Sequence, residues 1–240
     1  MQGLARPGPQ VAQRGRVATG GHVETGRDDA LRAAAAEPGF EIIETLRVTD
    51  GRALRGDRHL ARMAGTAARL GLGFDRAAAE ALLARLPAGD WRVRLGLTRD
   101  GLRLDHAPAP PPVDPMRLAL SPVRLDADDP WLRLKTSRRA VYDAARASLP
   151  AGVDEVIFLN RRDELCEGAI TTLFVQAGGV LLTPPLACGL LPGVLRAELL
   201  ERGAAREAVL RLPDLAAADA VYVGNSLRGL CRAIPPGPTP

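Results

Sequence analysis

The chain of 240 residues is long enough for one or two domains, and 46% of its residues are hydrophobic, which excludes a wholly disordered protein. No apolar run reaches the ~20 residues that a membrane-spanning helix needs, and the first twenty residues lack the apolar stretch of a secretory signal. The net charge of +4 arises from 32 basic and 28 acidic residues scattered along the chain, and aromatic residues make up only 3%, which favours a solvated mixed-charge surface over a nucleic-acid-binding one.

The first half of the chain predicts a small α+β unit behind an N-terminal segment without clear periodicity. Residues 1–37 are rich in Gly, Ala, Arg and Pro, and predict a mostly mobile segment with a short helix near Asp28–Glu37. Beyond them, apolar alternation predicts strands and apolar spacings of three and four predict helices. In chain order these are strands at Phe40–Val48 and Arg52–Leu54, helices at Asp57–Leu70 and Asp75–Leu86, and strands at Trp91–Thr98 and Leu102–His106.

A proline-rich stretch, Ala107–Pro115, predicts a semi-rigid boundary between this unit (38–112) and a second one (113–240), because five of its nine residues are proline. Strands and helices mixed within two blocks predict an α+β protein. The second unit predicts helices at Ser137–Leu149 and Gly193–Arg202, and strands at Met116–Val123, Val153–Leu159, Thr171–Gln176, Val180–Thr183, Ala208–Leu212, Ala220–Val223 and Leu227–Ile234.

The cysteines and histidines predict neither a disulfide framework nor a metal site. Three cysteines (Cys166, Cys188 and Cys231) lie far apart, which is typical of a reduced, cytoplasmic protein and lacks a zinc-ligand spacing. The three histidines do not cluster, and His59 is expected to pack on a helix face rather than to catalyse.

Lysine is the informative residue type in this sequence. Of the 32 lysine and arginine residues, only Lys135 is a lysine. Arginine replaces lysine on a surface at little cost. A guanidinium, however, stays protonated and forms no Schiff base with a carbonyl, whereas a desolvated lysine amine deprotonates and condenses with one. The single lysine therefore indicates either a reactive amine or one ordinary lysine left by chance.

Several motifs accompany Lys135 in a fixed order. Glu167 follows it by 32 residues, and shorter motifs precede and follow this pair. They are Glu44-Thr45-Leu46-Arg47, Arg58–Met63, Leu165–Phe174, Leu182–Leu186, Gly189–Arg196 and Gly224-Asn225-Ser226-Leu227-Arg228-Gly229. Together, over about residues 40–234, they resemble the class IV aminotransferases, the fold type IV enzymes that use pyridoxal 5′-phosphate (PLP). Within that family the resemblance is greatest to the branch of 4-amino-4-deoxychorismate lyases.

The resemblance implies roles for particular residues. Lys135 would hold PLP covalently and then move the substrate proton. Glu167 would pair with the pyridine nitrogen and keep it protonated. The cofactor phosphate would be bound at a helix start, where free N–H groups favour anions, by Arg62, Gly193, Val194, Leu195 and Ser226.

For the substrate, the resemblance and the strand pattern suggest a carboxylate-binding cation and a pocket wall. Arg94 would bind the substrate carboxylate, with Arg92 and Arg47 as further candidates. Thr45 and Thr172 would line the pocket. Tyr142 is discounted as a partner of the cofactor's ring hydroxyl, because its sequence distance from Lys135 departs from the transaminase spacing.

The implied fold is a small α+β domain and a larger pseudo-barrel domain, with the cofactor in the cleft between them. The implied enzyme is a cytoplasmic homodimer that converts a small molecule, 4-amino-4-deoxychorismate, to 4-aminobenzoate and pyruvate for folate synthesis. Functional pairing with an aminodeoxychorismate synthase is also implied.

Three alternatives remain open from the sequence. A transaminase of branched-chain or D-amino acids would share Lys135 and the cofactor. A basic nucleic-acid-binding module would not need Lys135. A degenerate family member would bind the cofactor poorly. The last is considered because the usual family opening is not recognisable in residues 1–37, and because residues 169–172 depart from the pattern of many relatives.

Overall fold

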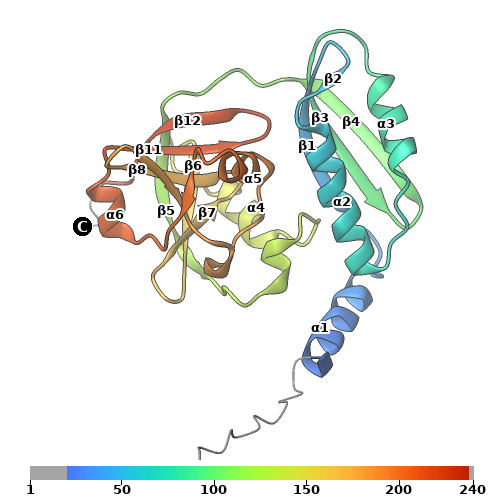
Figure 1. Ribbon diagram of the computed structural model, residues 1–240, viewed down its shortest axis with the longest axis horizontal. Coiled ribbons are helices and arrows are strands. Elements are labelled where there is room, and N and C mark those ends of the chain that lie inside the picture. Colours follow the sequence, from blue (N-terminus) through green and yellow to red (C-terminus); the bar gives the residue numbers. More distant parts are fainter. Residues whose placement is uncertain (1–20, 238–240) are drawn as a thin grey trace, which may run out of the picture.

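Two separate β-sheets organise the chain in the computed structural model, which describes residues 21–237 (Figure 1). The first sheet is antiparallel throughout and has the strand order β2-β1-β3-β4. Its strands are β1 (Ile42–Thr49), β2 (Arg52–Ala53), β3 (Asp90–Thr98) and β4 (Gly101–Pro108). They match the four strands expected in the first half of the chain.

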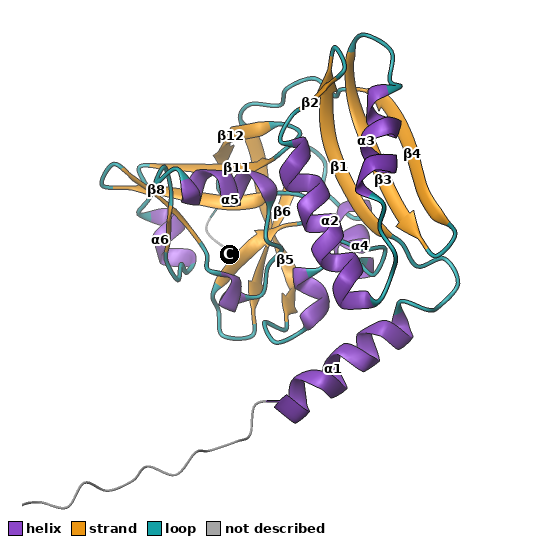
Figure 2. Cartoon of the chain, turned by 45° about the vertical axis from the view of Figure 1, so that its right-hand side comes forward, coloured by secondary structure: helices purple, strands orange, loops and turns teal. Residues whose placement is uncertain are grey.

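Two helices, α2 (Gly56–Leu70) and α3 (Arg76–Ala84), cover one face of this small sheet (Figure 2). Side chains alternate along a strand, so every second residue of β1 points toward the helices. Leu46 and Val48 pack there in an apolar cluster with Leu83 of α3. Glu44 occupies the same face of β1, where an unpaired carboxylate would be strongly destabilising.

A further helix, α1 (Gly21–Ala34), precedes the small sheet. Leu31 belongs to the apolar cluster that α2 contributes to, and Asp28 forms an ion pair with Arg69 of α2. The helix begins earlier than the one expected near Asp28–Glu37, and this part of the N-terminal segment packs on α2. The expectation of mobility for residues 1–20 lies outside the described residues.

The second sheet has eight strands in the order β10-β9-β8-β11-β12-β5-β6-β7, and β7 also pairs with β8. That extra pairing closes the six strands from β8 to β7 into a barrel, as expected for the pseudo-barrel of an α+β protein. The strands are β5 (Met116–Leu125), β6 (Glu155–Asn160), β7 (Leu165–Gly168), β8 (Thr172–Ala177), β9 (Val180–Thr183), β10 (Arg206–Glu207), β11 (Ala220–Asn225) and β12 (Gly229–Ile234).

Helices α4 (Ala140–Ala147), α5 (Val194–Glu201) and α6 (Leu212–Ala216) accompany the barrel, with 3₁₀ turns at Pro130–Arg133 and Leu186–Cys188. Buried apolar side chains from six of its strands form the largest barrel cluster. They include Met116, Leu118, Ile157, Leu159, Leu165, Leu173, Val175, Val221, Val223 and Cys231. Among the described residues, no helix is both long and apolar enough to cross a bilayer.

The structure corrects the prediction of a strand at Ala208–Leu212. The strand there is only the pair Arg206–Glu207, and α6 begins at Leu212. Leu210 and Leu215 are nonetheless buried in the barrel cluster, so the apolar residues that suggested a strand pack as a loop and a helix instead. The buried strand β7 was not expected from the sequence as a separate element.

Candidate active site

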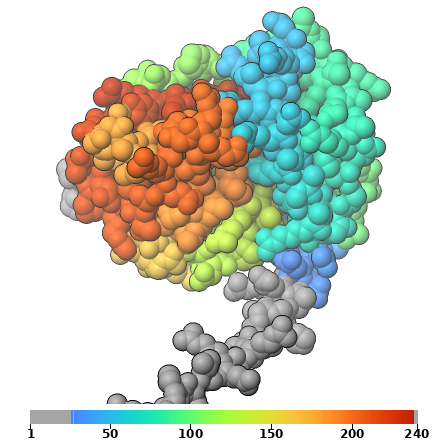
Figure 3. Space-filling model, in the orientation of Figure 1, coloured from blue at the N-terminus to red at the C-terminus, as the bar shows by residue number. Residues whose placement is uncertain are grey.

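One cavity of about 490 Å³ lies between the small sheet and the barrel. In the space-filling view, the small sheet and its helices lie directly against the barrel (Figure 3). All ten site residues expected from the sequence line this cavity: Thr45, Arg62, Arg94, Lys135, Glu167, Thr172, Gly193, Val194, Leu195 and Ser226. The fold therefore brings together residues that are separated by up to 181 positions, from Thr45 to Ser226.

Lys135 lies where the barrel half of the chain pairs with the small sheet. The backbone N–H of Ile43 in β1 donates to the Lys135 carbonyl at 2.8 Å, and Ile42 forms an isolated bridge with Thr136. Burial lowers the pKa of the Lys135 amine to about 8, and the nearby positive charge of Arg62 contributes to the shift. At pH 7 about a tenth of the amine is therefore unprotonated and nucleophilic, far more than for an ordinary lysine.

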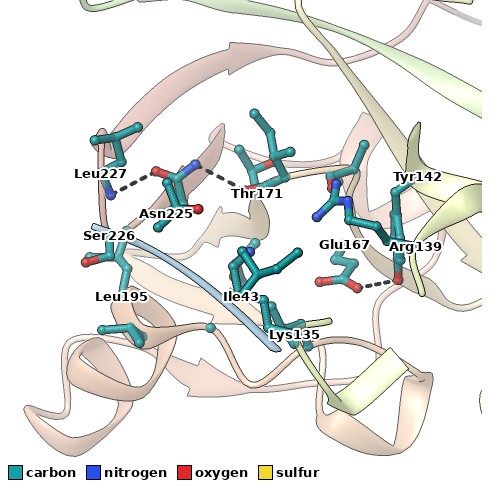
Figure 4. Close-up of a pocket in the computed structure, with 18 of the residues that line it drawn as sticks. Ile43, Lys135, Arg139, Tyr142, Glu167, Thr171, Leu195, Asn225, Ser226 and Leu227 are labelled. Atoms are coloured by element: carbon teal, nitrogen blue, oxygen red, sulfur yellow. Dashed lines mark hydrogen bonds between the residues drawn. The ribbon is translucent and has the colours of Figure 1, made fainter. Parts of the chain in front are cut away.

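Glu167 of β7 faces the cavity with its carboxylate buried (Figure 4). The Tyr142 hydroxyl of α4 donates to Glu167 Oε1 at 2.7 Å, and the backbone of Leu191 supplies a second hydrogen bond. Burial raises the pKa of Glu167 to about 7, because these hydrogen bonds and the positive charges of Lys135 and Arg139 offset only part of the desolvation. Tyr142 thus bonds Glu167, a role that the sequence reading did not anticipate.

Glu44 and Arg62 form a buried ion pair between β1 and α2. Arg62 donates from Nε to Oε1 at 2.8 Å and from Nη2 to Oε2 at 2.6 Å. Burial by itself would raise the pKa of Glu44, but the charge and hydrogen bonds of Arg62, together with His59, lower it to about 2. Arg62 Nη1 also donates to the Pro192 carbonyl at 2.9 Å, which ties α2 to the chain entering α5.

The start of α5 forms the next part of the cavity wall. Gly193 is its N-cap residue and supplies no side chain, so no side chain caps the first N–H groups of the helix. A Cβ on Gly193 would lie 2.7 Å from Thr172 Oγ1, which is closer than van der Waals contact allows. Glycine therefore permits the close approach of this backbone to β8, and leaves N–H groups available for an anion.

Ser226 lies in the turn between β11 and β12, on the side of the cavity away from Glu167 (Figure 4). Asn225 shapes this turn, since its side-chain oxygen accepts hydrogen bonds from the backbone N–H groups of Leu227 and Arg228. The Ser226 hydroxyl is 2.7 Å from His59 Nε2. His59 is buried and hydrogen-bonded on both ring nitrogens, so it does more than fill space on the helix face.

The cavity wall is strongly basic, with eight arginine and lysine side chains against the two carboxylates of Asp143 and Glu167. Arg94 stands opposite Thr45 in the β1–β3 register and forms an ion pair with Glu41. Arg47 forms an ion pair with Asp90 and does not line the cavity. The role of Arg94 as the substrate-carboxylate ligand stays a prediction.

Three lining arginines form no ion pair with any residue in the described range 21–237: Arg92, Arg146 and Arg228. Arg228 Nε is also buried without a hydrogen-bond partner. The sequence alone assigns no role to Arg228, Glu44 or Arg139. Glu44 and Arg228 lie inside motif segments, which was the available signal. Only the fold shows that Arg139 and Arg228 line the cavity and that Glu44 pairs with Arg62.

The family model described as amino-transferase class IV matches residues 41–234 of this chain. The chain belongs to the class IV aminotransferase family. A search of curated proteins found no match to the sequence.

Several solved structures resemble this fold over most of the chain. A Mesorhizobium loti protein, provisionally named an amino-acid aminotransferase, is 47% identical with a TM-score of 0.77, over 82% of this chain and 99% of that one. The 4-amino-4-deoxychorismate lyase of Pseudomonas aeruginosa is 30% identical with a TM-score of 0.71, over 81% and 82%. A hypothetical aminotransferase of Mycobacterium tuberculosis in its PLP-bound form is 26% identical with a TM-score of 0.71, over 85% and 86%.

We predict that the Glu44→Gln variant is destabilised by about 3–5 kcal/mol at pH 7, because it leaves Arg62 beside a neutral amide in a buried place. Glu201→Gln is the matched control, since Glu201 also pairs with an arginine (Arg58) but at the exposed surface, and we expect a much smaller loss. Urea unfolding of both variants measures the two free energies.

The pH dependence of this effect has a definite sign. The pKa of Glu44 is about 2 in the folded protein and its ordinary value is 4.5, so its ionised form stabilises the fold fully above about pH 4.5. As the pH falls from 4.5 toward 2, the free energy of unfolding of the wild type should approach that of Glu44→Gln. A difference in the free energy of unfolding that stays constant between pH 4.5 and 2 would contradict the ion pair assigned to Glu44 and Arg62.

We also predict that the Lys135 amine titrates near pH 8 rather than near 10.5. Because Lys135 is the only lysine, reductive methylation with ¹³C-formaldehyde labels one side chain and the N-terminal amine, and NMR follows both with pH. The same protein unfolded in urea is the control and should give the ordinary lysine value. A midpoint near 10.5 in the folded protein would show that the amine is solvated.

Proposed function

We propose that the protein binds PLP and acts as a 4-amino-4-deoxychorismate lyase that releases 4-aminobenzoate and pyruvate. The observation that carries the proposal is the position of the single lysine. Lys135 is buried in one cavity with the carboxylate of Glu167 and an excess of cationic side chains. The 30% identity to the P. aeruginosa lyase over most of both chains supports the reaction type.

The residues of the cavity fit PLP in its three polar parts. A buried amine with a lowered pKa suits the aldehyde, and the buried Glu167 carboxylate suits a protonated ring nitrogen. The uncapped start of α5, together with Arg62 and Ser226, suits the phosphate. The close contact that a Cβ on Gly193 would make with Thr172 is consistent with a wall that leaves room only for backbone there.

When bound, PLP supplies an electrophilic carbon that joins an amine and a ring that accepts electrons from the carbon carrying that amine. The Glu167 carboxylate would hold a proton on the ring nitrogen, and Tyr142 would orient that carboxylate through its 2.7 Å hydrogen bond. Burial raises the pKa of the Tyr142 hydroxyl, which therefore remains a donor throughout the working pH range.

Lys135 would first hold the cofactor covalently and then act as the base at the substrate. After exchange with the substrate's 4-amino group, its free amine would take the proton from the carbon that carries that group. The bond between the neighbouring carbon and the enolpyruvyl oxygen would break, and the enolpyruvate released would take up the proton that Lys135 removed and become pyruvate. Formation of the aromatic ring would drive the step. The two products contain all the atoms of the substrate, so no 2-oxo acid acceptor is consumed.

The basic wall suits a substrate with more than one carboxylate. Arg62 is neutralised by Glu44 and Arg94 by Glu41, whereas Arg92 and Arg228 have no acidic partner within residues 21–237. We propose that the substrate carboxylates bind these arginines, with Arg94 beside them and with Thr45 and Thr172 in the pocket wall. Arg92 and Arg94 are exposed and Arg228 is half-buried, so these side chains can reach an anionic ligand and favour it by charge and by hydrogen bonding.

The second candidate is an aminotransferase of branched-chain or D-amino acids. It is favoured by the M. loti protein, which is 47% identical and provisionally named an amino-acid aminotransferase. A transaminase needs the same amine, carboxylate and phosphate ligands, so the two reactions differ in the half-reaction that follows proton removal. A transaminase leaves nitrogen on the cofactor and requires a 2-oxo acid to remove it.

We predict that the PLP-loaded protein forms pyruvate and 4-aminobenzoate in equal amounts from 4-amino-4-deoxychorismate, with no 2-oxo acid present. Chromatography of the products measures both. Lys135→Arg is the control, because it keeps the positive charge but loses the amine chemistry, and we expect its rate to fall by at least a thousandfold, on the order of a lost general base. Absence of both products, together with transfer of an amino group from an amino acid to a 2-oxo acid, would favour the transaminase and reject the lyase.

A further inference from the structure

Four side chains form a continuous hydrogen-bonded chain between two places on the cavity wall. Arg62 donates to Glu44 with both Nε and Nη2, Glu44 Oε2 lies 2.6 Å from His59 Nδ1, and His59 Nε2 lies 2.7 Å from Ser226 Oγ. Glu44 and His59 are each 1% exposed, so water does not compete for these bonds. The two ends, Arg62 and Ser226, both line the cavity.

The protons along this chain can be assigned from its chemistry. The Glu44 carboxylate is ionised and can only accept, so His59 Nδ1 must carry a proton and donate it. Burial lowers the pKa of His59, which makes the neutral ring the favoured form, and its Nε2 is then an acceptor. The Ser226 hydroxyl therefore donates its one proton to His59, and only its lone pairs remain for the cavity.

This arrangement conflicts with a phosphate dianion at the start of α5. Phosphate oxygens accept hydrogen bonds, and a hydroxyl that points its proton at His59 presents only lone pairs to them. If the hydroxyl turns its proton to the phosphate, then Ser226 Oγ and an unprotonated His59 Nε2 would be two acceptors 2.7 Å apart. A proton on Nε2 removes that conflict, because the imidazolium donates to both neighbours.

The charges around His59 act on its protonation state in opposite directions. Glu44 of β1 favours the imidazolium, while Arg62 on its own helix and Lys135 across the cavity favour the neutral ring. Arg55, just before α2, donates to the Ser226 carbonyl and is paired with Glu198 of α5. A bound dianion adds two negative charges next to this group, and negative charge favours the protonated ring.

We propose that His59 is a positioning residue that takes up one proton at Nε2 when a phosphate-bearing ligand binds, so that the Ser226 hydroxyl donates to the ligand. The inference rests on the proposed function, in that it places the phosphate at the start of α5. One bond, from Ser226 to His59, is reversed in direction. A new hydrogen bond forms from Ser226 to the phosphate. The proton that His59 takes up at Nε2 comes from solvent.

The direct test is the number of protons taken up on binding. Pyridoxine 5′-phosphate is the probe, because it carries the phosphate but no aldehyde and cannot react with Lys135. Calorimetry at pH 8 in buffers of different ionisation enthalpy gives the uptake, and the phosphate is already a dianion there because its second pKa is about 6. We expect about one proton for the wild type, and an affinity that weakens by about tenfold per pH unit above neutrality.

Two variants separate this role from a structural one. His59→Gln places an amide that does not titrate where Nε2 was, and this amide can still donate to Ser226. Ser226→Ala removes the hydroxyl, so that a bound phosphate no longer requires a proton on His59 Nε2. We expect uptake in both variants to fall by about one proton relative to the wild type, with the pH dependence of affinity flattened. Equal uptake in the wild type and in His59→Gln would overturn the proposal while leaving phosphate binding intact.

A measurement on the unaltered protein guards against variants that fail to fold. With ¹³C-labelled histidine, NMR at pH 8 should show His59 neutral in the free protein and as an imidazolium with pyridoxine 5′-phosphate bound. His59 in one state under both conditions would overturn the proposal. Failure of the wild type to bind this probe more tightly than unphosphorylated pyridoxine would overturn both the phosphate site of the proposed function and this inference.

Discussion

The buried carboxylate of Glu44 constrains the rest of the site. A carboxylate on the helix-facing side of β1 is tolerated only because Arg62 and His59 of α2 satisfy it, and this fixes α2 against the small sheet. Those two partners then reach the other half of the protein, Arg62 through the Pro192 carbonyl and His59 through Ser226. One buried charge thereby sets the position of α2 against both α5 and the β11–β12 turn.

The chemistry of the cavity depends on the same contact between the small sheet and the barrel. Lys135 is held by the edge-to-edge contact of its backbone with β1, and the burial that results lowers its pKa to about 8. Glu167 lies on the barrel side, and Tyr142 of α4 fixes its carboxylate. The amine and the carboxylate therefore come from the barrel half of the chain, whereas α2 supplies Arg62 and β3 supplies Arg92 and Arg94.

Much of this arrangement can be predicted from sequence, because some residues carry their chemistry in their identity. The single lysine among 31 arginines points to Lys135, the family resemblance points to Glu167, and both line the cavity. Alternation locates the small sheet strand by strand. The chain Arg62–Glu44–His59–Ser226 could not be predicted, since its members lie up to 182 positions apart and only the fold joins them. At Ala208–Leu212 the sequence correctly indicated burial but not the type of element. Its apolar residues are buried in a loop and at the start of α6.

The most direct test of the account is covalent trapping at Lys135. The protein is incubated with PLP, reduced with borohydride and digested, and mass spectrometry locates any phosphopyridoxyl group. The account predicts a label on the peptide that contains Lys135, and no label at that peptide in Lys135→Arg. A folded protein that carries no label, or a label confined to the N-terminal amine, would contradict the claim that this buried lysine is the reactive amine of the site.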